Sequence, residues 1–336
     1  MEAVLFDQPR AARLAEVPQP SPGPGEVLVR TRLAGICGSD MHAYHGTQPF
    51  FVYPQTPGHE VVGEVVAGGE GVRLEAGGRV VVDPTVSCGQ CRPCRLGRYN
   101  CCANIRVLGV HVPGVLAEWF VAPAHRLHAV PDHVPDEVAV LAEPLSIGYH
   151  AADRAGVQTG DHVAIIGAGP IGLSLVLMVQ ARGARSLVVD LEPSRLAVAR
   201  RMGAEVTVDA SACDTVAAAL EWTEGDGVAL AFEAVGTPHT IRAAADMAGP
   251  TGRVVILGLC QKDVCLPGSM FVRKELEVVG SRLHQNTIEQ VVALLSTGAL
   301  DPRPLLSDIR PLASFQSALD DLDQRPARFL KIALQP

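Results

Sequence analysis

The chain has 336 residues, 48% hydrophobic and 19% charged, which is the composition of a globular protein long enough for two domains. Its formal net charge of −8 disfavours a nucleic acid or an anionic membrane as partner. The first residues lack the basic start and apolar core of a signal peptide, so we expect a cytoplasmic protein. In that reducing compartment its nine cysteines are better explained by metal than by disulfides.

The first part of the chain predicts short β-strands separated by turns rich in proline and glycine. A segment crowded with Cys37, Ser39, Asp40 and His42 lies between two of these strands. The predicted strands are 4–6, 26–33, 61–66 and 79–82, with further β structure over 107–130.

Four cysteines have the spacing of a structural zinc site. Cys88, Cys91 and Cys94 are three residues apart, which lets successive thiolates turn onto one ion. A longer loop returns the fourth ligand, for which the spacing favours Cys102 over the adjacent Cys101. Four cysteines close such a site and leave no position for substrate. A nucleic-acid-binding zinc ribbon would use the same chemistry, but the acidic charge balance makes it the lesser interpretation.

A second set of possible metal ligands is scattered along the chain. Cys37, the neighbours His59 and Glu60, and Glu143 are unremarkable one by one. Together they supply a thiolate, an imidazole and carboxylates. This mixed set suits a catalytic zinc with an open or water-filled position.

The stretch 163–190 predicts a strand, a tight turn, a helix and a second strand that ends at Asp190. In such a unit the first two glycines let the backbone turn and approach a pyrophosphate, and the third lets the helix pack on the strand. Asp190 can accept hydrogen bonds from a ribose 2′-hydroxyl and would repel a 2′-phosphate, so NAD is favoured over NADP. The turn consists of Gly167, Gly169, Pro170, Ile171 and Gly172 with one intervening residue.

Strand and helix patterns alternate to about residue 280, as expected for a doubly wound parallel sheet. A helix is expected after residue 141, before this sheet begins. The other predicted elements are helices at 195–202 and 239–248, strands at 228–232 and 253–257, amphipathic segments at 287–297 and 314–322, and a last strand at 329–334.

Several motifs occur in an order that resembles the zinc-containing medium-chain dehydrogenases: GICGSDMH, PGHE, CGQCRPCRLGRYNCC, AEPLSIGYHA and VAIIGAGPIG. The resemblance covers essentially the whole chain. Within this family the chain is most similar to the polyol and sugar-acid branch, which includes sorbitol, threonine and bacterial L-galactonate or L-gulonate 5-dehydrogenases. The stretches DPTVSCGQC, VLGVHVPG and RKELEVVGSRL most resemble the bacterial sugar-acid members. Alcohol dehydrogenases proper resemble the chain less, because they carry Cys where it has Glu143.

The resemblance implies roles for the scattered residues. Cys37 and His59 match two catalytic zinc ligands. Glu60 matches a carboxylate that binds the zinc directly or swings in during turnover, and Glu143 matches the remaining carboxylate, bound directly or through water. Asp40 is expected to hold the far nitrogen of His59 and fix its tautomer.

The same resemblance implies a proton relay and further cofactor contacts. Ser39 and His42 match the residues that carry a proton from the substrate hydroxyl to solvent, although His42 could instead be an exposed loop histidine. Arg195 resembles a second adenosine contact. Lys331 resembles a late basic residue near the pyrophosphate, with a surface lysine as the alternative.

The implied α/β protein has a GroES-like β-rich catalytic domain at 1–146, a NAD-binding Rossmann domain at 147–281, and a segment at 282–336 that returns to the catalytic domain. We expect two zinc ions per chain and NAD, and hydride transfer from a secondary alcohol of a polyol or sugar acid, with L-gulonate or L-galactonate favoured. The resemblance also implies a homodimer or homotetramer. The alternatives are an L-threonine 3-dehydrogenase, a general alcohol dehydrogenase, and a non-catalytic zinc-ribbon or regulatory protein.

Overall fold

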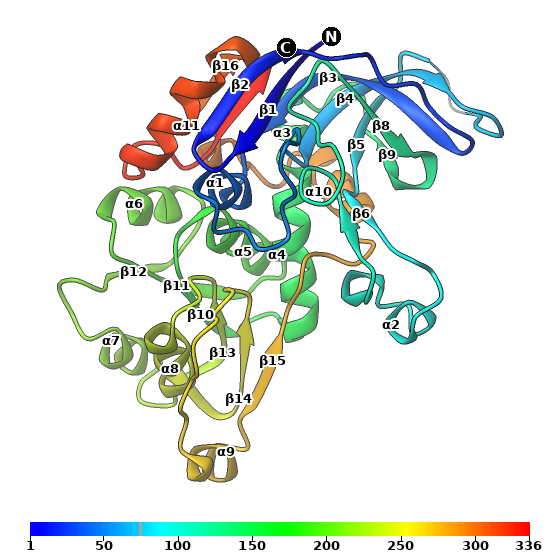
Figure 1. The fold of residues 1–336 in the computed structure, drawn as a ribbon. Helices are drawn as coiled ribbons and strands as arrows, with labels where there is room; N and C mark the ends of the chain where they lie inside the picture. The colour runs from blue at the N-terminus through cyan, green and yellow to red at the C-terminus, as the bar shows by residue number, and fades with distance from the viewer. Residues whose placement is uncertain (74–75) are drawn as a thin grey trace. The chain divides into compact units, whose positions relative to one another are not determined.

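The computed structural model describes residues 1–73 and 76–336 and divides into two compact units (Figure 1). Unit 1 consists of Met1–Glu143 and Ile288–Pro336, and unit 2 of Pro144–Thr287. The predicted domain boundaries, after residues 146 and 281, lie a few residues from these. Within the described ranges, no helix combines the length and apolar character that a membrane crossing requires.

Unit 1 is built on a mixed sheet. Its strands are β3 (Glu26–Gly35), β4 (Glu60–Gly68), β5 (Arg79–Val82), β8 (Trp119–Pro123), β9 (Leu127–Ala129), β16 (Asp308–Pro311) and β17 (Ile332–Gln335). Among the described residues they are ordered β16-β17-β3-β4-β5-β9, with β8 also paired to β3. All pairs in this sheet are antiparallel except β16 with β17. The C-terminal strand β17 also pairs with β3, so the end of the chain belongs to the same sheet.

Shorter elements surround this sheet. The strands β1 (Glu2–Gln8) and β2 (Ala11–Glu16) form an antiparallel pair, as do β6 (Thr85–Val86) and β7 (Arg106–Val107). The helices are α1 (Gly38–His45), α2 (Arg92–Arg95), α3 (Asp136–Ala139), α10 (Ile288–Ser296) and α11 (Phe315–Gln324), with 3₁₀ turns η1 (Tyr99–Cys101), η2 (Ala124–Arg126), η3 (Arg303–Leu305) and η4 (Leu312–Ser314).

The core of unit 1 forms because β-branched residues alternate along paired strands. Val27 and Val29 of β3 pack with Val61 and Val65 of β4 in one buried cluster. The register of this pair sets Gly35, the last residue of β3, opposite Glu60, the first of β4. The chain segments that carry Cys37 and His59 are therefore brought together by sheet pairing.

The β structure expected over 107–130 is present only in part. Strands β8 and β9 occupy its second half, whereas 108–118 forms a loop. Gly109 takes a positive φ of 71°, and its N–H donates to Val112 O, which closes a turn. Glycine and proline in this stretch thus interrupt a pattern that otherwise resembles a strand.

Unit 2, every residue of which is described, contains a parallel sheet of six strands. They are β10 (His162–Ile166), β11 (Arg185–Asp190), β12 (Val206–Asp209), β13 (Val228–Glu233), β14 (Ala248–Ile256) and β15 (Glu277–Gly280). The order β12-β11-β10-β13-β14-β15 reverses between β10 and β13. This order confirms the predicted doubly wound sheet.

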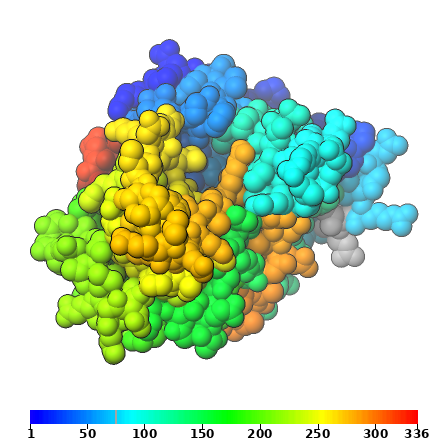
Figure 2. All heavy atoms as spheres, turned by 90° about the horizontal axis from the view of Figure 1, so that it is seen from below, coloured from blue at the N-terminus to red at the C-terminus, as the bar shows by residue number. Residues whose placement is uncertain are grey.

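Helices cover both faces of the sheet in unit 2 (Figure 1). Ala164 and Ile166 of β10 pack in one cluster with residues of α7 and α8. Ile165 points to the other face, where it lies beside Gly172 of α5. The helices are α4 (Ala142–Ala155), which begins in unit 1, α5 (Pro170–Ala181), α6 (Pro193–Arg201), α7 (Thr215–Trp222), α8 (Pro238–Met247) and α9 (Gly268–Lys274). Figure 2 shows the last of these, in yellow to orange, on the molecular surface.

Candidate metal centres and cofactor site

Cys37, His59 and Glu60 meet in unit 1, with one potential ligand atom from each lying within 4.8 Å of the others. Cys37 follows β3 and precedes α1, and His59 directly precedes β4. His59 and Glu60 are buried, with 7% and 1% of their surfaces exposed. The pairing of β3 with β4 therefore assembles three of the four scattered residues that were predicted as ligands.

Asp40 connects the two segments that carry these ligands. Its Oδ2 accepts a hydrogen bond from Cys37 N at 2.8 Å, and its Oδ1 accepts one from Gly58 N at 3.1 Å. The predicted hydrogen bond to the far nitrogen of His59 is not formed, because Oδ1 lies 3.9 Å from Nδ1. Asp40 instead fixes the backbone on either side of the site.

The two residues predicted to relay a proton lie in different surroundings. Ser39 is half-buried, and its Oγ lies 3.5 Å from His59 Nε2, at the limit of a hydrogen bond. His42 is exposed on α1, with Nδ1 3.1 Å from Thr47 Oγ1. Ser39 thus adjoins the ligand cluster, whereas His42 lies at the solvent side of the same helix.

Glu143 joins the cluster electrostatically rather than as a fourth close ligand. It lies in the first turn of α4 and is 4% exposed. Burial raises its pKa to about 7; His59 opposes the shift, and Glu60 adds to it. Asp83 also raises this pKa. Sequence reasoning missed Asp83, although its pattern, an acid directly after an apolar strand, is the same one that drew attention to Asp190.

The electrostatics of the cluster favour a cation. Burial by itself lowers the pKa of His59, but Cys37 and Asp40 raise it well above its usual value. A buried imidazole that is driven toward its charged form indicates an excess of negative charge around it. A zinc ion would occupy such a position by replacing the proton on the imidazole, so the donor set fits the predicted catalytic zinc.

Lys331 has a partner that the sequence did not reveal. Its Nζ donates to both oxygens of Glu60, at 2.7 and 2.6 Å, and to Ile36 O at 3.3 Å. It is 1% exposed, which excludes the surface-lysine alternative. These contacts use the three donors of an ammonium group, so they give Lys331 partners other than the expected pyrophosphate. They also hold the Glu60 carboxylate that was expected to bind zinc or swing toward it.

The four cysteines of the predicted structural site form a compact group. Sγ of Cys91 lies 3.4 Å from that of Cys94 and 3.8 Å from that of Cys102, and Cys102 lies 3.5 Å from Cys88. Zinc–sulfur bonds of about 2.3 Å at tetrahedral angles set sulfurs about 3.8 Å apart. The set therefore fits zinc, and the structure groups Cys102 rather than the adjacent Cys101.

The acidity of the thiols differs within this cysteine lobe, residues 88–102: burial raises the pKa of Cys94 to about 11, whereas backbone hydrogen bonds lower the pKa values of Cys88 and Cys91. The neighbouring backbone N–H groups of Gln90 and Cys91 lower the pKa of Cys88 to about 6. Thiolates are the form that binds metal. The lobe lies on the surface, in the cyan region of Figure 2, and its helix α2 has no buried residue.

A buried network anchors the lobe to the sheet of unit 1. Tyr99, inside the lobe, donates its hydroxyl to Asp83 Oδ2 at 2.8 Å. Arg126 donates to the same oxygen at 2.6 Å, and its guanidinium lies 4.4 Å from the centre of the Tyr99 ring. The stacking and the shared carboxylate fix the lobe where β5 ends.

In unit 2 the glycine turn lies between β10 and α5, as predicted. Gly167 has a φ of 102°, which favours glycine, and a Cβ on Gly172 would collide with the carbonyl of Gly167. Asp190 at the end of β11 accepts from Ala168 N at 2.6 Å and from Glu192 N at 2.9 Å. Arg195 is half-buried on the nearby α6. The turn, Asp190 and α6 thus surround the carboxyl ends of the two strands, where dinucleotides bind in this fold.

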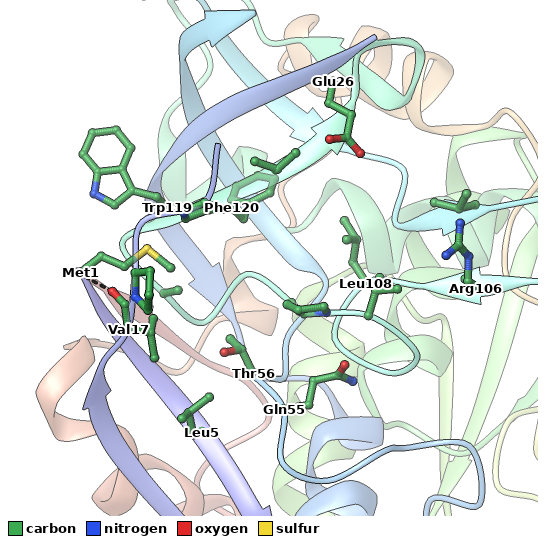
Figure 3. A pocket seen from close by; sticks show the side chains of 18 of the residues that line it. Met1, Leu5, Val17, Glu26, Gln55, Thr56, Arg106, Leu108, Trp119 and Phe120 are labelled. Atoms are coloured by element: carbon green, nitrogen blue, oxygen red, sulfur yellow. Dashed lines mark hydrogen bonds between the residues drawn. The ribbon is translucent and has the colours of Figure 1, made fainter. Parts of the chain in front are cut away.

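A separate cavity of about 510 Å³ lies in unit 1 (Figure 3). Leu5, Leu108, Trp119 and Phe120 give it a largely apolar wall, with Arg106 at one side. None of the predicted zinc ligands is among the described residues that line it. The cavity is therefore distinct from both cysteine-containing clusters.

Two family models match the chain. The model of the alcohol dehydrogenase GroES-like domain matches residues 23–132, and that of the zinc-binding dehydrogenase matches residues 170–297. An uncharacterized zinc-type alcohol dehydrogenase-like protein of Haemophilus influenzae is 36% identical, in an alignment that covers 99% of this chain and 98% of that protein. Sorbitol dehydrogenase of Bacillus subtilis is 33% identical over 100% of this chain and 97% of that protein. L-Galactonate-5-dehydrogenase of Escherichia coli is 34% identical over 94% of this chain and 93% of that protein.

Solved structures agree with these relatives. The short chain alcohol dehydrogenase RspB of Escherichia coli CFT073, complexed with NADH, has a TM-score of 0.95 at 33% identity and covers 100% of this chain and 99% of its own. A zinc-binding dehydrogenase of Sinorhizobium meliloti, bound to NADP, has a TM-score of 0.94 at 32% identity with the same coverage. The chain therefore belongs to the zinc-containing medium-chain dehydrogenases, a family of oxidoreductases that act with zinc and a nicotinamide dinucleotide.

Proposed function

We propose that the protein oxidises a secondary alcohol of a polyol or sugar acid and transfers the hydride to NAD, with substrates of the L-gulonate or L-galactonate type favoured. The observation that carries this proposal is the cation-favouring cluster of half-buried Cys37 and buried His59 and Glu60, with Glu143 as its neighbour. The names of the sorbitol and L-galactonate dehydrogenases support the substrate class.

The residues of unit 1 have distinct tasks in this reaction. A bound zinc ion supplies the acidity that the substrate hydroxyl lacks, as it lowers the pKa of bound water from about 15.7 to about 7. Cys37 and His59 would hold the ion, and Asp40 keeps their backbone segments in place. Ser39 Oγ would take the hydroxyl proton and pass it toward His42 and solvent.

The choice of NAD rests on Asp190. Its carboxylate lies at the end of β11 and fixes the glycine turn through Ala168 N. Each oxygen of a carboxylate can accept a further hydrogen bond, so Asp190 can still receive a ribose hydroxyl. A 2′-phosphate at the same place would meet a negative charge. Arg195, on the next helix, is proposed as the second adenosine contact.

A substrate screen tests the proposal. Purified protein, loaded with zinc and NAD, is supplied with hexitols, hexonates, L-threonine and simple alcohols, and NADH formation is followed by absorbance. We expect the highest kcat/KM with a hexonate or hexitol. Preference for L-threonine would move the protein to the threonine dehydrogenases, and activity on simple alcohols alone would overturn the substrate class. Absence of NADH with every substrate would favour a non-catalytic role.

We also propose a homodimer or homotetramer that acts in the cytoplasm on a small-molecule substrate. The cytoplasmic assignment is supported by the chemistry of the cysteine lobe, whose thiols must remain reduced to bind zinc. Light scattering after gel filtration measures the assembly directly, and a monomer at micromolar concentration would contradict it.

A further inference from the structure

Glu233 is a buried acid at the carboxyl edge of the sheet in unit 2, and nothing in the proposed reaction uses it. It is the last residue of β13 and has no exposed surface, at 0%. The parallel register sets it beside Ile166, the residue before the glycine turn. Strand order reverses between β10 and β13, and ligands of doubly wound sheets bind outside this switch point.

One oxygen of Glu233 gathers three donors. Oε1 accepts from Val235 N at 2.9 Å, from Gly236 N at 2.7 Å and from Thr240 Oγ1 at 2.8 Å. Thr240 also takes part in the capping of α8, since its N–H donates a hydrogen bond to Thr237 Oγ1 at 3.1 Å. A single carboxyl oxygen therefore fixes the loop 234–237 and the first turn of the helix that follows.

The backbone of Glu233 ties in a second loop. Its carbonyl accepts from Leu257 N at 2.8 Å and from Gly258 N at 3.1 Å. A Cβ on Gly258 would lie 2.7 Å from Glu233 Oε2 and would collide with Gly236 N. The loops after β13 and β14 are thus in backbone contact, and the Glu233 side chain lies where they meet.

The loop held by Glu233 packs against the glycine turn. A Cβ on Gly167 would lie 2.8 Å from Cγ2 of Val235, and Val235 itself remains 50% exposed. The turn and this loop face each other across the switch point between β10 and β13. Val235 and Gly236 therefore form a wall opposite the turn that approaches the pyrophosphate.

The second oxygen of Glu233 distinguishes this group from an ordinary loop anchor. Oε2 is buried, and no residue of the fully described unit 2 donates a hydrogen bond to it. Buried polar atoms without a hydrogen-bond partner are rare and costly, so a second role for this side chain is expected. One acceptor oxygen satisfies the donors of the loop, so the second oxygen has no part in holding it.

We propose that Glu233 is a positioning residue for the dinucleotide: it presets the Val235–Gly236 wall against the glycine turn, so that NAD binds without reordering the loop. This inference rests on the proposed NAD-dependent function. A preformed wall contributes to affinity because the ordering cost is met before the cofactor arrives. Loss of Glu233 must then weaken cofactor binding more than it slows the chemical step.

The test compares Glu233→Ala, Glu233→Gln and Thr240→Val with the zinc-loaded wild type, using NADH fluorescence for Kd and NAD titration for KM and kcat. We expect Glu233→Ala to raise the NADH Kd and the NAD KM about tenfold while kcat changes less than about threefold. Glu233→Gln keeps an acceptor oxygen and should recover most of the affinity. Glu205→Ala is the matched control, because Glu205 precedes β12 at the opposite edge of the sheet and should leave the Kd unchanged.

The outcomes distinguish failure of the positioning role of Glu233 from failure of the proposed NAD-dependent function. A folded Glu233→Ala that binds NADH as the wild type does, or that loses kcat and thermal stability with an unchanged Kd, overturns the positioning role. If Glu233→Ala does not fold, Thr240→Val removes one donor and keeps the acid, and an unchanged Kd in that variant overturns the inference instead. A wild-type protein that fails to bind NADH refutes the proposed function and the inference with it.

Discussion

Lys331 and Glu60 form an ion pair whose side chains are 2% and 1% exposed. Although burial opposes its charge, Glu60 raises the pKa of Lys331 above its usual value. Burying two charges is costly, and their attraction and hydrogen bonds offset that cost only while both partners remain. The pair therefore fixes the C-terminal strand β17 to the residue next to His59.

Removing the lysine should be strongly destabilising. We expect Lys331→Met to lower the free energy of unfolding by about 3–5 kcal/mol, because it leaves the Glu60 carboxylate buried without a cation. Urea denaturation measures the loss. Adding Glu60→Gln in the same chain should restore part of it, since the buried charge is then gone. A loss below about 1 kcal/mol in Lys331→Met would show that the pair contributes little.

Asp190 combines a structural and a selective role, and two substitutions separate them. Asp190→Ala removes the acceptor of Ala168 N and the charge, so the NAD KM should rise and discrimination against NADP should fall. Asp190→Asn keeps an acceptor oxygen, so it should retain more NAD affinity while discrimination still falls. Initial rates with NAD and NADP give the ratio of kcat/KM values. An unaltered ratio in both variants would remove Asp190 from cofactor selection.

At the scale of elements, the cysteine lobe is anchored by the Tyr99–Asp83–Arg126 network, and its four grouped thiols fit a zinc ion. Adjacent cysteines at its end provide a matched pair of variants. Cys102→Ser should lower the zinc content by about one ion per chain and reduce thermal stability, because structural zinc contributes directly to folding. Cys101→Ser should leave both unchanged. Elemental analysis measures the zinc content of both variants. Loss of zinc in Cys101→Ser but not in Cys102→Ser would assign Cys101 as the ligand.

A second element-scale contact joins β11, β12 and α7 in unit 2. Glu205 accepts hydrogen bonds from Arg185 Nε at 2.6 Å and from Trp222 Nε1 at 3.2 Å. The Arg185 hydrogen bonds lower the pKa of Glu205 to about 2, from the usual 4.5. A lowered pKa means that the contact stabilises the fold above about pH 4.5 and that this contribution disappears as the pH falls toward 2.

Comparison with Glu205→Gln isolates that contribution. The wild type should unfold at higher urea concentration than Glu205→Gln at pH 7, and the difference should shrink as the pH is lowered through the acidic range. The effect will be modest, since solvent screens a side chain that is 38% exposed. A difference between the two proteins that does not change with pH would contradict the account.

The sequence pattern was sufficient to predict those elements in which residues close in the sequence are also close in space. The strand, turn, helix and strand of 163–190 could be predicted because glycine, apolar runs and Asp190 lie within one βαβ unit. The strand β12 and the helix α7 were not singled out, because four and eight residues give little periodicity. The N-cap of α7, Asp214, accepting from Val216 N, is a local signal that could have marked that helix.

The site could be predicted only as far as residue type and spacing extend. The four cysteines were assigned by spacing, and Cys37, His59 and Glu60 by motif. The partner of Glu60 could not be predicted, since Lys331 is 271 residues away and meets it only through the pairing of β17 with β3. Glu233 ends an apolar strand as Asp190 does, so the same pattern could have drawn attention to it.

At the scale of the whole molecule, the two units carry separate parts of one proposed reaction. Unit 1 contributes the cation-favouring cluster and the cysteine lobe, and unit 2 contributes the glycine turn, Asp190 and the loop held by Glu233. The two candidate zinc sites are independent, because they share no potential ligand among the described residues. Loss of the zinc at Cys37 should therefore abolish activity while the lobe keeps its metal.

NADH formation measured against zinc content tests the central claim most directly. The wild type, reloaded stepwise after metal removal, is assayed with NAD and the best substrate of the screen, and Cys37→Ala is assayed beside it. We expect activity to rise only as the zinc content passes from one to two ions per chain, and Cys37→Ala to retain one zinc and form no NADH. NADH formation at the full rate by chains that hold a single zinc, or by Cys37→Ala, would contradict the account.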